Sequence, residues 1–126
     1  RRAISVRCTC QPALSSVRAD EQLLRHGLTN LMWNAIQAID HDGVITLRGA
    51  CENGWVLLAV GDTGGGVPPE IERRIFDVFF SSKPQGAGLG LSIVQRVARV
   101  HRGEVTLDNQ PGAGCTFTLR FPFQPH

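Results

Sequence analysis

Two glycine clusters and one aspartate have the residue types and spacing of a site for a phosphorylated ligand. Asp62 lies two residues before a glycine run at residues 64–66, and about twenty residues later comes a second cluster, Gly86-Ala87-Gly88-Leu89-Gly90-Leu91. Glycine has no Cβ and tolerates positive φ, so the backbone in such stretches can approach a ligand closely. This arrangement predicts a nucleotide site, because an apolar strand leads to an acidic residue and a glycine turn, and a second glycine turn opens a helix.

A helix expected between Asp20 and Ile39 carries the other polar candidates. Asp20 is a residue type that caps helix N-termini, and Glu21 follows in the first turn, where the helix dipole favours an anion. One apolar stripe recurs at three- and four-residue steps: Leu24, Leu28, Leu31, Ala35 and Ile39. The same spacing on the opposite side is held by Asn30, Asn34 and Gln37. The helix is therefore expected to hold a row of amides that faces away from the core.

The remaining elements predict the fold class. Strands are expected at residues 3–11, 44–50, 55–60, 104–107 and 115–121, a short helix at 68–76 and a longer helix at 89–100. The last helix is expected to bury Leu89, Ile93, Val97 and Val100. Mostly antiparallel strands whose helices must cover one face indicate an α/β (α+β) sandwich of two layers.

Length and charge exclude several classes. The 126 residues are enough for one domain, residues 1–126, and the net charge of +2 is too small to indicate nucleic-acid binding. No apolar run approaches the ~18 residues that span a bilayer. The abrupt start at Arg1 indicates a fragment of a longer protein.

The four cysteines are expected to be reduced core residues. Cys8 and Cys10 alternate with polar residues on one face of the first strand, and Cys115 shares its face with Phe117. Cys8-x-Cys10 has no second ligand pair of the kind that a structural zinc site requires. Cysteine behaves as a small hydrophobe in such positions.

Four stretches together resemble the N, G1, F and G2 boxes of sensor histidine kinases. They are Asn30-Leu31-Met32-Trp33-Asn34-Ala35, Asp62-Thr63-Gly64-Gly65-Gly66, the aromatic set 76–80 and the second glycine cluster. They occur in the family's order, and residues 112–117 are similar to its last glycine motif. The resemblance runs from Ile4 to Pro122 and implies the Bergerat fold, a mixed sheet covered on one face by about three helices. It also implies ATP and Mg²⁺ as the ligands.

The resemblance implies a role for each site residue. Asp62 would accept a hydrogen bond from the adenine amino group, Gly64 and Gly66 would let the chain pass close to the purine, and Thr116 would support Asp62 or a bound water. Asn34 would be the magnesium ligand. Asn30 stands where the related gyrase and heat-shock-90 ATPases carry a glutamate that activates water. Since an amide cannot remove a proton, ATP hydrolysis is expected to be slow.

The phosphate side is implied in the same way. Lys83 would reach the phosphates and act with Asn30 and Asn34 in catalysis. The backbone of the second glycine box would bind the phosphates at the positive end of the following helix, through Gly86, Gly88, Leu89, Gly90 and Leu91. Three departures from the family pattern make affinity less certain: Gln37 replaces a lysine, Asp77-Val78 replaces glutamate-proline, and Ala87 replaces a serine or threonine.

The phosphate acceptor is expected to lie outside this chain. Histidine kinases phosphorylate a histidine that precedes an acidic residue on a helix, and here only His41-Asp42 has that neighbour, within a turn. The expected partners are therefore the dimerisation domain of the same kinase and a downstream response regulator, without nucleic acid or membrane insertion. A cytoplasmic location is expected, with membrane anchoring of the parent left open. The alternatives are an ATPase or serine kinase of the same fold, and a non-catalytic nucleotide-sensing module.

Overall fold

The structure is a computed structural model that describes residues 3–10, 19–67, 69–72, 75 and 90–123. Along these residues the elements follow the predicted order: β1 (Ile4–Cys10), α1 (Glu21–Ala38), β2 (Gly43–Glu52), β3 (Trp55–Asp62), α2 (Pro69–Glu72), α3 (Gly90–Val100), β4 (Glu104–Gln110) and β5 (Gly114–Pro122). No helix in this described part is long and apolar enough to cross a membrane. The aromatic set 76–80 lies outside the described residues.

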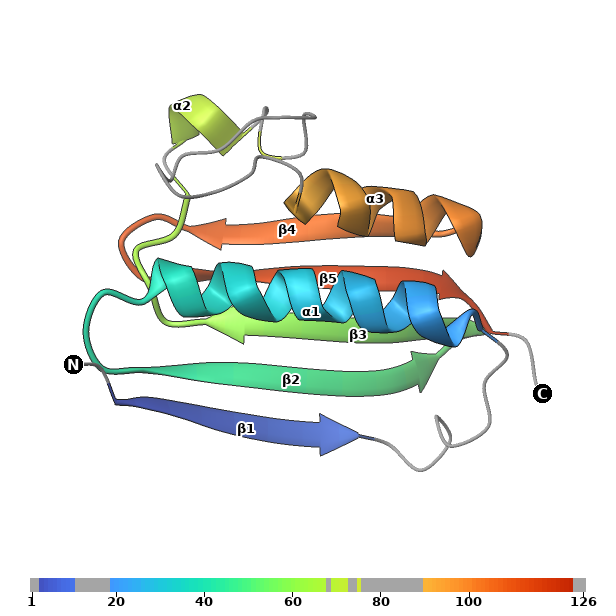
Figure 1. The fold of residues 1–126 in the computed structure, drawn as a ribbon, viewed down its shortest axis with the longest axis horizontal. Helices are drawn as coiled ribbons and strands as arrows, with labels where there is room; N and C mark the ends of the chain where they lie inside the picture. The colour runs from blue at the N-terminus through green and yellow to red at the C-terminus, as the bar shows by residue number, and fades with distance from the viewer. Residues whose placement is uncertain (1–2, 11–18, 68, 73–74, 76–89, 124–126) are drawn as a thin grey trace.

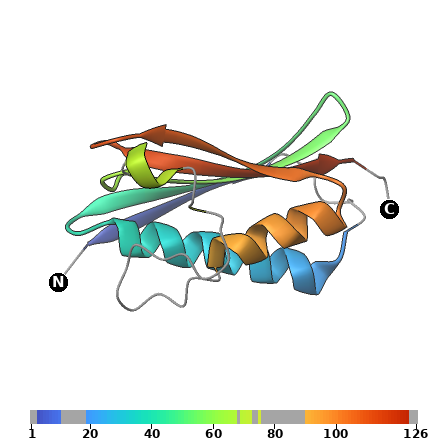
Figure 2. The ribbon, with the colours of Figure 1, turned by 90° about the horizontal axis from the view of Figure 1, so that it is seen from above.

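The strands form one sheet with the helices on a single face. The strand order is β1-β2-β3-β5-β4. β1 is parallel to β2, and the other neighbouring strands are antiparallel. Figures 1 and 2 show α1 and α3 side by side on the same face of the sheet. The predicted two-layer α+β sandwich is thereby confirmed, with two long helices and the single turn α2 where about three helices were expected.

A tight hairpin joins β2 to β3 and sets their register. Asn53 and Gly54 have φ angles of 52° and 82°. Positive φ at both central residues is typical of a type I′ turn, whose twist matches that of the flanking strands. Ile45 therefore pairs with Asp62. This register places Asp62 at the last paired position of β3, beside the start of β2.

The core lies between the sheet and the two long helices. The predicted stripe of α1 is confirmed at Leu31, Ala35 and Ile39, each at most 2% exposed. The inward positions of β5 are also confirmed, because Cys115, Phe117, Leu119 and Phe121 are all buried. Since alternate residues of a strand face opposite sides, Thr116 lies on the open face of the sheet.

The prediction that Cys8 and Cys10 are core residues is wrong, because both are exposed. Val6, which shares their face of β1, is 55% exposed. β1 is an edge strand, and α1 packs on β3 and lies away from β1 in Figure 1. An apolar strand face becomes buried only where another element covers it. No described helix extends far enough to cover this one.

The buried side of α3 confirms the prediction at Val97 and differs from it at other positions. The structure buries Leu91, Val94, Val97 and Ala98, whereas Val100 is 56% exposed. Ile93 is half-buried, and Leu89 lies outside the described residues. Val97 packs closely against α1, because a Cβ on Gly27 would lie 3.5 Å from its side chain. This close approach turns Val97 and its neighbours toward α1 and the sheet.

His101 ties the end of α3 to the start of α1. Its Nε2 accepts from the Asp20 N–H at 2.9 Å, and its Nδ1 donates to the Val97 carbonyl at 2.8 Å. The Asp20 carboxylate in turn accepts from the Leu23 N–H at 3.0 Å, which confirms Asp20 as the N-cap. The two helices are thus joined at one end by side-chain and cap contacts.

Candidate functional site

The carboxylate of Asp62 is held by its own chain on the helix-covered side of the sheet. Oδ1 accepts a hydrogen bond from the Gly64 N–H at 2.8 Å. Oδ2 accepts from the thiol of Cys115 at 3.5 Å. Each carboxylate oxygen has two lone pairs, so each can accept a further hydrogen bond. The carboxylate is therefore oriented and still able to bind a donor on a ligand.

Cys115 keeps its proton beside this carboxylate. It pairs with Asp62 across β3 and β5 and is only 5% exposed. Burial, and then the negative charge of Asp62 and the hydrogen bond to it, raise the pKa of the thiol to about 12. At neutral pH the thiol is accordingly a donor to Asp62, because a thiolate could not donate.

The glycine run after Asp62 is held between α1 and the β4–β5 hairpin. A Cβ on Gly64 would collide with the carbonyl of Ala38, at the end of α1. Gly66 has a φ of 75°, and a Cβ there would lie 2.8 Å from the Gln110 carbonyl oxygen. In contrast, a Cβ on Gly65 would have no described atom within 4 Å. Two of the three glycines are thus required by close packing, and the middle one is not.

The amides of α1 lie on the flank that faces α3. Asn30 and Asn34 are one turn apart and both are half-buried. Asn34 follows Gly27 by two turns, and Gly27 lies against Val97 of α3. The Asn30 amide donates to the His26 carbonyl at 2.8 Å. No hydrogen bond joins the Asn34 side chain to another residue in the described part of the chain. Its oxygen is therefore available to a ligand.

Three described parts of the site meet near the C-terminal end of α1. Ala38, whose carbonyl touches Gly64, is one turn beyond Asn34. α1 and α3 run in opposite directions, and α3 begins beside the C-terminal half of α1 (Figure 1). Leu91 of α3 packs in the same core cluster as Ala35. The Asp62 carboxylate, the amide flank and the start of α3 therefore surround one region.

The start of α3 suits an anion. No acidic residue occupies its first turn. The unpaired N–H groups and the dipole of a helix N-terminus together favour phosphate. Gly90, the first residue of α3, is therefore in a position to offer its N–H group to a phosphate.

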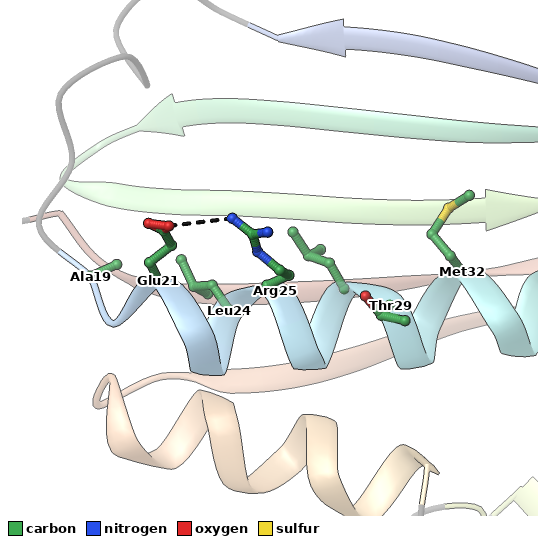
Figure 3. Close-up of a pocket in the computed structure, with 7 residues that line it drawn as sticks. Ala19, Glu21, Leu24, Arg25, Thr29 and Met32 are labelled. Carbon is green, nitrogen blue, oxygen red and sulfur yellow. Dashed lines mark hydrogen bonds and ion pairs between the residues drawn. The ribbon is translucent and has the colours of Figure 1, made fainter.

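A separate hollow of about 590 Å³ lies on the other flank of α1. Figure 3 shows its lining side chains pointing away from α3, with the Glu21–Arg25 ion pair of 3.3 Å among them. Its apolar lining is Leu24, Leu28 and Met32. None of the predicted site residues lines this hollow, which distinguishes it from the region beside Asp62.

The family model described as histidine kinase-, DNA gyrase B- and HSP90-like ATPase matches residues 19–125. The chain belongs to this ATPase family. Proteins similar to this chain include sensor histidine kinases. It is 42% identical over 122 residues to the sensor histidine kinase ZraS of Klebsiella oxytoca, covering 96% of this chain and 26% of the relative. It is 37% identical to the signal transduction histidine-protein kinase AtoS of Escherichia coli, covering 89% of this chain and 19% of AtoS.

Solved structures of histidine kinases have the same ATPase-family fold. Full-length ShkA in complex with AMPPNP matches 98% of this chain with a TM-score of 0.86 and 34% identity, over 26% of the ShkA chain. The catalytic domain of histidine kinase ThkA matches 94% of this chain, over 78% of its own length, with a TM-score of 0.83 and 31% identity. The chain thus spans about a quarter of the length of the ZraS relative. The resemblance to sensor histidine kinases is confirmed.

The predicted residues of the ATPase site fall into two groups. The structure brings Asn30, Asn34, Asp62, Gly64, Gly66 and Gly90 to one region. Leu91 is also there, but its side chain is only 9% exposed and packs in the core, so its backbone alone remains for a ligand. Lys83, Gly86, Gly88 and Leu89 lie outside the described residues, and their roles stay predictions.

The described hydrogen bond from β5 to the Asp62 carboxylate comes from Cys115, and a role for Thr116 through a bound water stays a prediction. Thr116 pairs with Gly61 on the open face, while Cys115 lies beside the carboxylate. Strand parity could have shown this, because Cys115 shares its face with the buried Phe117. A second residue that the sequence did not reveal is Asn109, which bonds to the backbone of Val67 beyond the glycine run. No motif marks that position.

Proposed function

We propose that this chain is the ATP-binding catalytic domain of a sensor histidine kinase. It binds ATP with Mg²⁺ and donates the γ-phosphoryl group to a histidine on a separate dimerisation domain, from which a response regulator receives it. The proposal is supported by the ATPase family and by relatives named as sensor histidine kinases. The observation that carries it is the Asp62 carboxylate, held by Gly64 and Cys115 beside the amide flank of α1.

Asp62 recognises the base in this proposal. Adenine presents an exocyclic amino group, which is a donor, and a fixed carboxylate is a matching acceptor. Because Gly64 and Cys115 already hold the carboxylate, little conformational freedom is lost when the base binds. Gly64 and Gly66 leave no side chains in the way of the purine.

Asn34 fits a magnesium ion. Its amide oxygen is a hard, neutral ligand that no other described residue occupies, and Mg²⁺ takes oxygen ligands and needs few from protein when phosphate oxygens are present. When bound, the ion neutralises charge on the phosphate oxygens. Asn30 contributes an amide, which cannot take a proton from water, so the γ-phosphoryl group is preserved for transfer.

The described histidines support an acceptor outside the chain. Both ring nitrogens of His101 are engaged in hydrogen bonds. His41 has an acidic neighbour, but Asp42 accepts a hydrogen bond from the Ala3 N–H at 2.9 Å and so anchors the start of β1. His26 is exposed and precedes Gly27, without an acidic residue to act as base. The domain accordingly acts on a partner domain of the same kinase.

Titration with a fluorescent ATP analogue, with and without Mg²⁺, tests the proposal. Asp62→Ala is expected to abolish binding, because it removes the acceptor for the base. Asn34→Ala is expected to remove the dependence of binding on Mg²⁺. Unchanged binding in both variants would contradict the assignment of the site.

A second measurement separates the alternatives. The chain is incubated with radiolabelled ATP and a supplied dimerisation domain. We expect labelled phosphate on that domain and slow release of free phosphate. Rapid hydrolysis by the chain alone would favour a related ATPase, and binding of ATP without any transfer would favour a nucleotide-sensing module.

A further inference from the structure

The side chain of Asn109 on β4 bonds to the peptide groups on both sides of Val67. Its Oδ1 accepts from the Val67 N–H at 2.8 Å, and its Nδ2 donates to the Val67 carbonyl at 2.7 Å. The same Nδ2 donates to Glu72 Oε1 of α2 at 2.9 Å. A side-chain amide that both donates to and accepts from one residue imitates a strand neighbour. β3 ends at Asp62, so Val67 has no neighbouring strand. The Asn109 side chain makes the two backbone hydrogen bonds to Val67 that a neighbouring strand would otherwise make.

This contact fixes the far end of the glycine run. Val67 directly follows Gly66 and is 8% exposed in the core cluster beside α1. The other described attachments of the run are the Gly64 N–H to Asp62 and the Gly112 N–H to the Gly65 carbonyl, at 2.8 and 2.7 Å. Without Asn109, the partly buried N–H and carbonyl of Val67 would lack partners, which is costly inside a protein.

The position of this run determines how Asp62 is oriented. The Gly64 N–H that holds Asp62 Oδ1 belongs to the same short segment that Asn109 fixes at Val67. A shift of the segment would therefore move the donor away from the carboxylate. The carboxylate would then be free to rotate, and its match to a particular base would weaken.

We propose that Asn109 is a positioning residue for nucleotide selectivity. It fixes the glycine run and, through the Gly64 N–H, sets the Asp62 carboxylate for adenine and against guanine. Adenine presents an amino donor where guanine presents a carbonyl acceptor, and a fixed carboxylate repels the latter. This inference rests on the proposed function, because it assumes that the purine binds at Asp62.

The decisive measurement compares ATP with GTP. The dissociation constants of both nucleotides are measured for the 126-residue chain, for Asn109→Ala and for the control Asp108→Ala. Asp108 is the neighbouring residue, exposed on the other side of β4, and its described hydrogen bond is to Gln110. We expect Asn109→Ala to weaken ATP by about tenfold and GTP much less. The control is expected to leave both constants unchanged.

A purely structural role would give a different result. If Asn109→Ala only destabilised the folded domain, it would lower the melting temperature but leave the ratio of the ATP and GTP dissociation constants as it is in the wild type. An unchanged ratio in Asn109→Ala therefore overturns the inference. If the wild type binds ATP, that outcome leaves the proposed function standing. If the wild type binds neither nucleotide, the proposed function falls and this inference with it.

A charge-based rescue provides a second, independent test. Asn109→Asp keeps an acceptor for the Val67 N–H but loses the donor to its carbonyl and sets a carboxylate against Glu72. We expect a loss of ATP preference at least as large as in Asn109→Ala. Adding Glu72→Gln supplies an amide that can donate to the introduced carboxylate, so part of the preference should return. A wild-type ratio in Asn109→Asp overturns the inference.

Discussion

Cys115 and Thr116 are neighbours on β5 that face opposite sides of the sheet, and this decides which of them acts on Asp62. Cys115 is buried and donates its S–H to the carboxylate at 3.5 Å. Thr116 pairs with Gly61, and a Cβ added to Gly61 would lie 2.9 Å from the Thr116 hydroxyl oxygen. The hydroxyl therefore lies over the open face, away from the carboxylate.

Separate substitutions of Cys115 and Thr116 should show which of the two side chains affects nucleotide binding. Cys115→Ala removes the donor to Asp62, and we expect nucleotide affinity to fall about fivefold, the effect of a hydrogen bond worth about 1 kcal/mol. Cys115→Ser keeps a donor and should bind nearly as the wild type does. Thr116→Ala is the matched control and should change nothing. Titration with the ATP analogue measures all three, and a larger loss in Thr116→Ala than in Cys115→Ala would contradict this assignment.

The raised pKa of Cys115 also predicts how stability depends on pH. In the unfolded chain the thiol ionises near its ordinary value of 9.0, whereas in the folded chain it keeps its proton up to about 12. The unfolded state therefore gains stability as pH rises through this window, and the free energy of unfolding falls. Below pH 9 the contribution is fully present.

Comparison with Cys115→Ala isolates this thiol, because all other ionisable groups are the same in both proteins. Urea denaturation at about pH 8 and about pH 10.5 should therefore show a larger fall for the wild type than for Cys115→Ala. Equal falls in the two proteins would show that Cys115 does not carry the effect.

At the scale of elements, the glycine run offers a comparison between adjacent residues. A Cβ on Gly64 would collide with the Ala38 carbonyl, whereas a Cβ on Gly65 would meet no described atom within 4 Å. Gly64→Ala must therefore push the run away from α1, at a cost of roughly 1–3 kcal/mol, as for overpacking in a core. Gly65→Ala should leave the free energy of unfolding nearly unchanged. Chemical denaturation of both variants tests this, and similar losses would contradict it.

Most helices and strands could be predicted from local sequence patterns, that is, from residue types at positions close together in the chain. Asp20 as a helix cap, the Asn53-Gly54 hairpin and the α1 stripe depend on neighbours in the sequence, so the sequence alone contains the relevant information. The burial of Cys8 depends on whether a distant helix covers β1, and here α1 covers β3. The candidate site divides in the same way. Its glycines and amides follow motifs, but the Asn109 contact joins residues 42 apart in sequence and has no local signal.

At the scale of the whole molecule, the described part of the candidate site lies within a single sheet-and-helix unit. The chain covers 26% of the ZraS relative and 78% of the ThkA catalytic domain. Asp62, the amide flank of α1 and the start of α3 all belong to the same sheet-and-helix unit. Binding of ATP should therefore be a property of this unit, whereas the proposed transfer of the phosphoryl group would also need a partner that supplies a histidine.

This separation of binding from transfer can be tested by thermal unfolding of the chain alone. A ligand at a hundred times its dissociation constant stabilises the folded state by about 2.7 kcal/mol. For a domain of this length that is a rise in Tm of roughly 10 °C. We expect Mg-ATP to produce this rise in the wild type, since the site lies within one unit, and to produce none in Asp62→Ala, which lacks the acceptor for the base. Thr116→Ala, altered on the open face, should show the wild-type rise. A rise that appears only after the dimerisation domain is added would mean that the site is incomplete in this chain.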